Sequence, residues 1–385
     1  MIKGHCIGYG VILTILWMVT SAIPSQAAAT QFWVYIGTYT RPPHASKGIY
    51  LYRLDTQTGE IVEKGVAAEL ADPGWQNVPP GDKFLYSDGS TDDHRTSVIF
   101  ACRLDRTSGL LTLLNSQPTH GKGTTHVDVD PTGSCAVTAN YSSGDISVLP
   151  INPDGTLEPP SAVIKHFGSS INPDRQQHPF PHSCNFDPSG KFVLVPDLGV
   201  DKVYIYRFDA AGKKLTEIEP APVKPGSGPR HLSFHPNGKF VYLINEMGGT
   251  VTVFGWDGGS GRMTTLQTIS TLPLDYKGVN TSAEVHLLPS GRFLYASNRG
   301  PNDLAIFAVD PGTGLLALKG FESTRGKGPR DFDIDPTGNF LIAANQDSDS
   351  VVMYRIDQNT GALTAMGDML HIPSPICVTF VPVAQ

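Results

Sequence analysis

The chain carries few charged residues and no cluster of basic ones. Charged residues make up 17% of its 385 positions, and the formal net charge is −7. A nucleic-acid-binding surface needs Lys and Arg gathered along one face or segment. We therefore expect no nucleic-acid partner.

Cysteine is scarce, and its spacing offers no paired motif. The five cysteines include no C-x-x-C pair, and Cys6 precedes an apolar N-terminal stretch, while Cys102, Cys135, Cys184 and Cys377 fall in segments typical of strands. Zinc and thiol-redox sites usually depend on paired spacing. We interpret these four residues as buried thiols, although an exported location would permit a disulfide.

The motifs of several common enzyme classes are absent. The chain has no G-x-S-x-G elbow, no H-E-x-x-H helix and no Walker loop. Beyond residue 30 it shows no sustained 3.6-residue apolar period, so we expect no helical domain.

The N-terminus is typical of an export signal. Lys3 precedes an apolar stretch from Ile7 to Val19, and Ser25-Gln26-Ala27 offers a small-residue cleavage site. The apolar stretch is shorter than the ~20 residues of a membrane span. We predict a cleaved signal peptide over residues 1–28 and an exported, periplasmic or secreted, protein without stable membrane insertion. Residues 29–385 are then the mature domain.

One sequence segment recurs, with small changes, five times along the mature chain. The copies are THVDVDPTGSCAVTAN, PHSCNFDPSGKFVLVPD, PRHLSFHPNGKFVYLINE, AEVHLLPSGRFLYASNR and PRDFDIDPTGNFLIAANQ, and their turn glycines recur at roughly 47 to 57 residues. That period is the size of a four-stranded propeller blade. Degenerate copies begin at Phe32 and Pro79, so we predict an all-β, seven-bladed β-propeller. In one unit we expect strands over 239–245, 250–254 and 263–270.

The two ends of the chain predict how the ring closes. FWVYIGTYT resembles the second strand of a unit, and the tail SPICVTFVPV resembles a first strand. Pairing of these N- and C-terminal strands would close the propeller and remove open sheet edges. A blade cannot bury its faces without neighbours, so we expect one domain and a monomer.

One ring of positions departs from the repeat. The start of each first strand and the end of each second strand should meet at one mouth of the central channel. The residues there are nearly all ionisable or amides: His126 with Asn140, His182 with Asp197, Arg230 with Glu246, Glu284 with Arg299, and Arg330 with Gln346, together with His231. Such groups can simply satisfy strand ends and bind water. Two arginines, a carboxylate and an imidazole in one concavity instead suggest an anion-binding catalytic site.

A family resemblance becomes specific in one unit, SGPRHLSFHPNGKFVYLINEMGGTVTVF. With YIGTYT, ANYSSGDISVLPINPDG, HPFPHSCNFDPSGKFVLVPDLGVDKVYIYRFD and FLYASNRGPNDLAIFAVD, it resembles the 6-phosphogluconolactonase-type lactonase family of seven-bladed propellers, which includes fungal carboxymuconate lactonizing enzymes. The resemblance covers essentially the whole mature chain. It implies site residues at His182, Arg230, Glu246 and Arg299.

The second blade departs from the family pattern. ADPGWQNVPPGDKFLYSDGS lacks the usual Asn-Glu ending, and the acidic, His-containing loop Asp92–Arg95 follows it. A lid and a plain surface loop are the two interpretations of this segment, and we favour the surface loop.

The resemblance implies a lactone hydrolase that opens a sugar or related anionic lactone to the hydroxy acid. One arginine would stabilise the oxyanion, His182 or Glu246 would be the general base, and the second arginine would hold a carboxylate or phosphate. The remaining ring residues would bind substrate: His126, Asn140, Asp197, His231, Glu284, Arg330 and Gln346. The arginines would repel a cation, so we expect no essential metal and no cofactor. A carboxymuconate-type cycloisomerase and a secreted binding propeller remain alternatives.

Overall fold

Four-stranded antiparallel sheets make up the domain. The structure is a computed structural model that describes residues 29–384, with Met1, Ile2 and Gly4; the predicted signal peptide lies outside the described residues. Seven such sheets are present, as predicted, and within residues 29–384 the only helix is the 3-10 turn η1 (Gln346–Ser348). None of the described helical residues forms a helix that could cross a membrane.

Each sheet is one blade, and its strands follow one another outward from the central channel. From the innermost strand outward, blade 1 contains β28 (Pro375–Pro382), β1 (Gln31–Thr38), β2 (Gly48–Asp55) and β3 (Glu60–Glu69). Blade 2 contains β4 (Gln76–Asn77), β5 (Phe84–Ser90), β6 (Ser97–Leu104) and β7 (Leu111–Pro118). Blade 3 contains β8 (Thr124–Val129), β9 (Cys135–Asn140), β10 (Asp145–Pro150) and β11 (Ala162–Lys165).

The other blades repeat this order. Blade 4 contains β12 (Asn185–Phe186), β13 (Phe192–Asp197), β14 (Lys202–Asp209) and β15 (Lys214–Pro222). Blade 5 contains β16 (Pro229–Phe234), β17 (Phe240–Asn245), β18 (Thr250–Asp257) and β19 (Arg262–Ser270). Blade 6 contains β20 (Ser282–Leu287), β21 (Phe293–Asn298), β22 (Asp303–Val309) and β23 (Leu316–Ser323), and blade 7 contains β24 (Pro329–Ile334), β25 (Phe340–Asn345), β26 (Ser350–Ile356) and β27 (Leu363–His371).

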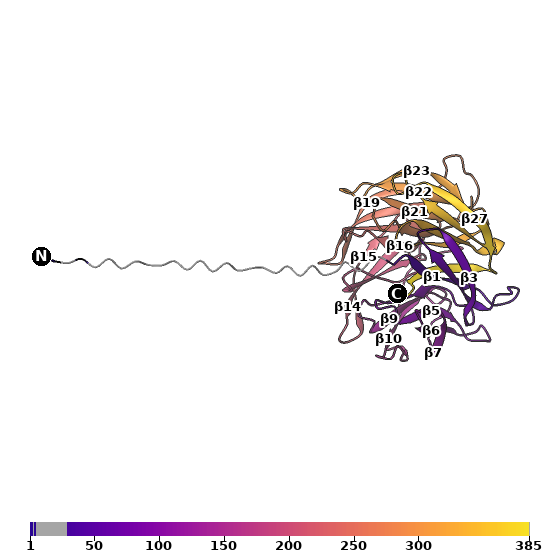
Figure 1. Cartoon of the computed structure of the whole chain (residues 1–385), viewed down its shortest axis with the longest axis horizontal. Coiled ribbons are helices and arrows are strands. Elements are labelled where there is room, and N and C mark those ends of the chain that lie inside the picture. The colour runs from indigo at the N-terminus through magenta and orange to yellow at the C-terminus, as the bar shows by residue number, and fades with distance from the viewer. Residues whose placement is uncertain (3, 5–28, 385) are drawn as a thin grey trace.

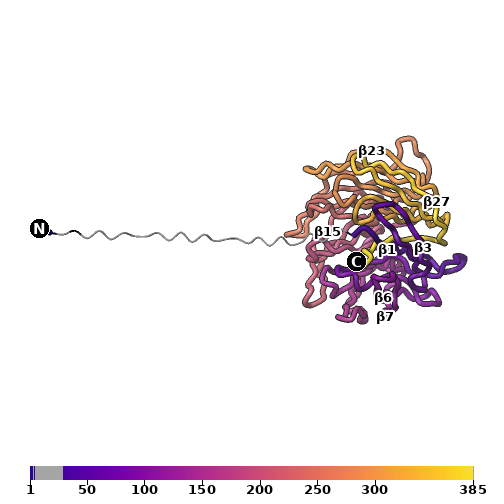
Figure 2. Tube along the Cα trace, in the orientation of Figure 1, coloured from indigo at the N-terminus to yellow at the C-terminus, as the bar shows by residue number. Residues whose placement is uncertain are grey.

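The ring closes by pairing of the chain's two ends, as predicted. Strand β1 lies antiparallel to β28, with Phe32 opposite Pro382 and Ile36 opposite Val378. Figure 1 and Figure 2 both show the C-terminus beside β1. The paired strands leave no open edge at the seam between first and last blades.

The repeated Asp-Pro-x-Gly segments are turns, as their composition predicts. In blade 3 the Asp130 carboxylate accepts hydrogen bonds from the backbone N–H groups of Ser134 (2.8 Å) and Cys135 (2.7 Å). Gly133 adopts a φ of 72°, which a side chain would disfavour. These acids therefore hold the reversal between the first two strands of a blade.

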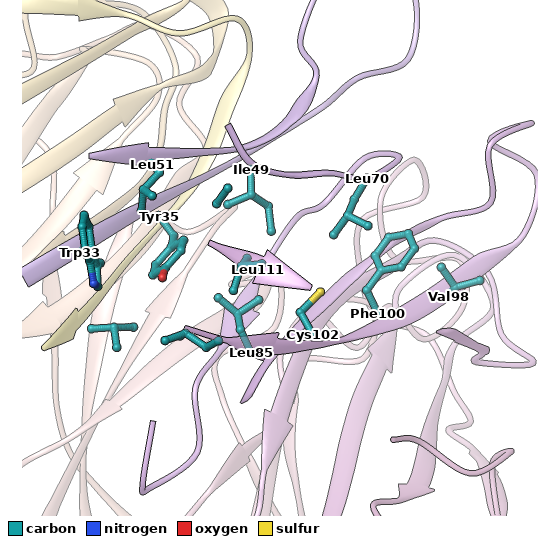
Figure 3. Close-up of a cluster of buried hydrophobic side chains, with 13 residues drawn as sticks. Trp33, Tyr35, Ile49, Leu51, Leu70, Leu85, Val98, Phe100, Cys102 and Leu111 are labelled. Carbon is teal, nitrogen blue, oxygen red and sulfur yellow. The ribbon is translucent and has the colours of Figure 1, made fainter. Parts of the chain in front are cut away.

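Apolar side chains fill the space between neighbouring blades. Between blades 1 and 2, Trp33 and Tyr35 lie against Leu85, Phe100 and Cys102, and all are buried (Figure 3). Within the described residues the four remaining cysteines are buried and unpaired, as predicted for core thiols. With the cores placed between blades, the channel is left to polar side chains.

Candidate functional site

A β-bulge near the start of the inner strand places consecutive side chains beside the channel. In β16 Pro229 lies opposite Asn245 and Leu232 opposite Leu243, so Arg230 and His231 together face one residue of the neighbouring strand. The registers of β8, β20 and β24 shift at the equivalent place. Bulges re-aim side chains and are common at functional sites. The residues that vary among the repeat units therefore lie where a bulge interrupts the hydrogen bonding between the first and second strands of a blade.

The Glu246 carboxylate gathers the charged part of this site. Its Oε1 atom accepts a hydrogen bond from Arg175 Nη2 at 2.7 Å. Its Oε2 atom lies 3.0 Å from Arg299 Nη2, 3.3 Å from Arg230 Nε and 4.0 Å from His182 Nε2. The structure thus brings together the four residues implied by the family resemblance and adds a third arginine.

Electrostatics divide the roles of these groups. Burial alone would raise the pKa of the Glu246 carboxyl, but the charges of Arg299 and Arg230 outweigh it and lower the pKa to about 2. Burial, together with the charges of Arg299 and Arg330, lowers the pKa of Arg230 to about 9. At neutral pH Glu246 is therefore an anion that holds cationic guanidinium groups in place, and it is a poor proton acceptor.

A chain of buried hydrogen-bonding groups runs from His182 along the channel. His182 Nδ1 lies 3.2 Å from His231 Nε2, and His231 Nδ1 lies 2.6 Å from Glu284 Oε2. Burial and the charge of Arg230 lower the pKa of both His182 and His231 well below the usual value. Both imidazoles are therefore neutral at pH 7, and a neutral imidazole is the form that can accept a proton.

Two adjoining cavities lie beside this cluster, and the inner one is lined by one of its residues, Arg230. The wider one, about 340 Å³, is lined by residues that include Tyr39, Asp88 and Thr125. The same three residues also line a cavity of about 20 Å³ that contacts Arg230 and Arg330. The wider volume lies within the range of small-molecule sites, while the inner one has room for about one water molecule. We call this side of the channel the arginine end.

The last residues of the inner strands line a different cavity, of about 250 Å³, which we call the acid end. It contacts His126, Asp128, Glu284 and His286, among others. Burial raises the pKa of Asp128 to about 7. His126 stacks on Trp75 with ring centroids 4.3 Å apart. This end therefore holds acids and imidazoles where the other holds guanidinium groups.

Three side chains at the acid end come close enough to share an ion. Ligand atoms of Glu284, His286 and Asp331 all lie within 4.8 Å of one another. Both Glu284 oxygens are already engaged, however: Oε2 lies 2.6 Å from His231 Nδ1, and Oε1 accepts a hydrogen bond from the backbone N–H of Val285 at 2.9 Å. We therefore assign no metal to these residues.

Three predicted ring residues lie outside the cluster. Asn140 donates to Asp145 Oδ1 and Ser147 Oγ, each at 2.8 Å, and so ties β9 to β10. The Asp197 carboxylate accepts from the backbone N–H of Phe180 at 2.7 Å and contacts His166. Gln346 begins η1 directly after β25. The predicted strand pairs are offset by one or two residues, because the register places Thr124 opposite Asn140 and Ser282 opposite Asn298.

The remaining ring residues divide between the two ends. Arg330 lines the inner cavity of the arginine end, with its guanidinium carbon 5.8 Å from the centre of the Tyr39 ring. Glu284 and His126 line the acid end, and His231 lies between the ends, contacting both cavities. The single ring predicted from the sequence is therefore two groups of residues.

Several site residues escaped the sequence analysis. Arg175 belongs to the 166–181 loop, which is not part of the repeat, so no alignment of units could reveal it. Asp88 lies near the end of β5, the second strand of the atypical blade 2, and its position there was the available signal. The 92–95 loop is exposed, as predicted for a surface loop, and its His94 and Arg95 also line the wider cavity, where His94 Nδ1 contacts Asp72 Oδ2 at 2.8 Å.

Comparison with known proteins agrees with this architecture. The family described as "Lactonase, 7-bladed beta-propeller" matches residues 33–380. The 6-phosphogluconolactonase of Bacillus subtilis is 35% identical over 352 residues, which cover 91% of this chain and 99% of that protein. The 6-phosphogluconolactonase of Formosa agariphila is 32% identical over 308 residues, covering 78% of this chain and 86% of its own.

A solved structure gives the same result. The periplasmic gluconolactonase of Pseudomonas aeruginosa superimposes with a TM-score of 0.85 at 32% identity, covering 92% of this chain and 100% of that one. The match spans every blade of the ring, and the identity is high enough to indicate common descent. The chain therefore belongs to the lactonase family of seven-bladed β-propellers.

Proposed function

We propose that the protein hydrolyses an anionic sugar lactone to the corresponding hydroxy acid. The observation that carries the proposal is the position of His182, a neutral imidazole 4.0 Å from a carboxylate that also contacts three arginines. Such a site offers a base and fixed positive charge in one water-poor place. Those are the groups that attack of water on an ester carbonyl requires.

His182 is the general base in this mechanism. Glu246 cannot fill that role, because the surrounding arginines lower its pKa to about 2. The 4.0 Å gap between His182 Nε2 and Glu246 Oε2 is too long for a direct hydrogen bond but short enough for one water to donate to both atoms. That water is the nucleophile. General acid–base assistance of this kind contributes about 10²–10⁴-fold to rate.

Arg230 stabilises the oxyanion that forms on the carbonyl oxygen. It is 2% exposed, and its Nη1 donates to the backbone oxygen of Ala283 at 2.6 Å, so the guanidinium is fixed before substrate binds. A donor held in this way incurs little reorganisation in the transition state. The protonated His182 then donates to the ring oxygen as the C–O bond breaks, which regenerates the neutral imidazole and yields the hydroxy acid.

The wider cavity supports an anionic substrate. Arg41, Arg95 and Lys122 line it, and Arg330 lies beyond them in the inner cavity. A phosphate or carboxylate would meet positive charge along this route. Gluconolactone and its 6-phosphate are the first substrates to test, since the relatives bear those names. We further propose export through residues 1–28, and a monomer, because one chain supplies every contact of the site.

The proposal is tested by proton release from a panel of lactones that includes 6-phosphogluconolactone, gluconolactone and a muconolactone. We expect turnover by the mature protein, with or without EDTA, and a loss of about 10²-fold or more in a His182→Gln variant. His371→Gln, an exposed histidine at the end of β27, is the matched control and should retain full activity. Absence of turnover above the spontaneous rate on every lactone would refute the function.

A further inference from the structure

The proton on neutral His182 can reside on either ring nitrogen, and only one choice makes a base at the site. A neutral imidazole donates from one nitrogen and accepts at the other. Nε2 faces Glu246 and Nδ1 faces His231. If Nε2 carried the proton, the atom nearest the proposed water would have no lone pair to accept with. The partner of Nδ1 therefore decides whether His182 can act.

The far end of the hydrogen-bonded chain fixes the direction of every bond in it. Glu284 Oε2 lies 2.6 Å from His231 Nδ1 and 3.9 Å from Arg230 Nη1, while Oε1 accepts from the backbone N–H of Val285. An ionised carboxylate accepts only. An ionised Glu284 therefore requires the proton of His231 to sit on Nδ1, which leaves Nε2 of His231 as an acceptor for the Nδ1–H of His182.

Burial raises the pKa of Glu284 and raises the pKa of Asp331, which lies beside it, further still. Both carboxyls are 2% exposed, and two close buried carboxyls do not both ionise. Asp331 Oδ2 accepts one backbone N–H, from Val378, and Oδ1 has no hydrogen-bond partner among the described residues. Glu284 Oε1 accepts the backbone N–H of Val285, and Glu284 Oε2 lies 2.6 Å from an imidazole and 3.9 Å from the Arg230 guanidinium. The shared proton is therefore better placed on Asp331, with the charge left on Glu284.

We propose that Glu284 and His231 are positioning residues that hold His182 as its Nδ1–H tautomer, with the lone pair of Nε2 directed at the Glu246 site. The meaning of this chain for catalysis rests on the lactonase function proposed above; the tautomer itself does not. The arrangement also answers an electrostatic difficulty. His182 must become positive beside several arginines, and the carboxylate of Glu284, one imidazole away, offsets that charge.

The groups around His231 leave its Nδ1 with one acceptor. The Trp75 ring contacts the His231 ring edge-on, with ring centroids 4.9 Å apart, and the His126 and His231 ring centroids are 5.4 Å apart. Arg230 precedes it in β16, and its charge disfavours a second positive charge on the imidazole. Among the described residues the hydrogen-bond partner of His231 Nδ1 is Glu284 Oε2, and an ionised carboxylate can only accept, which sets the direction of this bond.

The tautomer is measured directly by long-range ¹H–¹⁵N correlation of the histidine rings at pH 7, which needs no substrate. We expect the wild type to show His182 protonated at Nδ1 and unprotonated at Nε2. In Glu284→Gln the amide can donate to His231, and the chain should reverse, so that His182 becomes protonated at Nε2. The control His286→Gln, which alters a neighbour of the other Glu284 oxygen, should leave the wild-type pattern. A wild-type His182 protonated at Nε2 would overturn the proposal.

Kinetics give the second measurement. Glu284→Gln should lower kcat about 10²-fold or more while KM changes little, because the substrate contacts remain. If that variant does not fold, as judged by circular dichroism, His231→Phe removes the acceptor with similar ring volume and should also shift the His182 proton to Nε2. Wild-type inactivity on every lactone together with the expected tautomer would refute the function and support the chain. An active enzyme with unchanged kcat in both variants would refute the chain alone.

Discussion

The two ends of the channel hold the same kind of group in opposite states. At the arginine end, guanidinium charges overcome burial and lower the pKa of Glu246 to about 2. On β24, next to Glu284 of the acid end, burial raises the pKa of Asp333 to about 8, and the charges of Glu284 and Asp335 add to it. Each carboxyl lies in one β-propeller channel, so the fold alone does not set its charge. The identity of the residues beside each inner strand does.

The arginine end is therefore suited to binding anions, whereas the acid end contains carboxyl groups whose raised pKa keeps them protonated. Arginines and a neutral imidazole suit a substrate that develops negative charge, whereas neutral carboxyls do not attract it. His231 joins the two, since it contacts both cavities. We infer that chemistry takes place at the arginine end and that the acid end supports it from behind.

The largest difference expected between the two ends is in the free energy of unfolding when one carboxyl group is replaced at each. Glu246→Gln leaves Arg230 and Arg299 without their shared partner, and breaking such a buried pair costs about 3–5 kcal/mol. Asp333→Asn replaces a carboxyl that is already neutral at pH 7, so stability should be unchanged or raised. Urea unfolding at pH 7 measures both free energies. Equal losses in the two variants would show that the ends do not differ.

The next largest effect concerns rate. Arg230→Met removes the proposed oxyanion donor and should lower kcat/KM by about 10²–10³-fold, as loss of one such donor does elsewhere. His286→Gln changes a channel residue of the acid end and should stay within about twofold of the wild type. Initial rates on the best lactone from the panel decide the matter. A comparable loss in His286→Gln would place chemistry at both ends.

The fold could be predicted from the sequence because its signal is repeated. The predicted strands over 239–245 and 263–270 differ by one residue from β17 and β19, whereas β18 continues three residues past the predicted 254. Closure of the ring could also be predicted, since the N-terminal segment begins with a second strand and the C-terminal tail supplies the missing first strand. The repeat period and the alternation of apolar and polar residues are read from many positions, so a single residue that departs from the pattern does not change the predicted fold.

The site was less accessible because it depends on departures from the repeat. Counting along ideal ladders paired His126 with Asn140, but a bulge moves the partner of Asn140 to Thr124. Asn140 could have been set aside, since Asn245 and Asn298 occupy equivalent strand ends and donate to the third strand in the same way. Arg175 could not have been found, because its loop has no counterpart in the other units.

A smaller effect follows from the acid end alone. An aspartate in an unfolded chain has a pKa near ~3.9, while burial raises the pKa of Asp333 to about 8. Between these values the unfolded state loses its proton first, so the Asp333 contribution to stability falls as pH rises from about 4 to about 8 and is level above that. Asp333→Asn should therefore gain stability relative to the wild type across this window.

Unfolding free energies at pH 5, 7 and 9 test this dependence, with Asp310→Asn as the matched control. Asp310 is an exposed turn residue whose hydrogen bonds lower its pKa, so its variant should not gain on the wild type as pH rises. A constant difference between Asp333→Asn and wild type at all three pH values would mean that Asp333 is ionised in the fold.

The smallest expected effect is at the entrance of the arginine end. Lys122 is exposed and lines the wider cavity, so it meets an anionic substrate through solvent. Exposed charge pairs are worth about 0.2–1 kcal/mol, and Lys122→Ala should raise KM for 6-phosphogluconolactone by up to about fivefold at low salt, with kcat unchanged. The increase should shrink at 0.5 M NaCl, because salt at that level screens charges more than a few ångströms apart. Neutral gluconolactone is the matched control. An equal rise in its KM would mean that Lys122 shapes the cavity and does not attract charge to it.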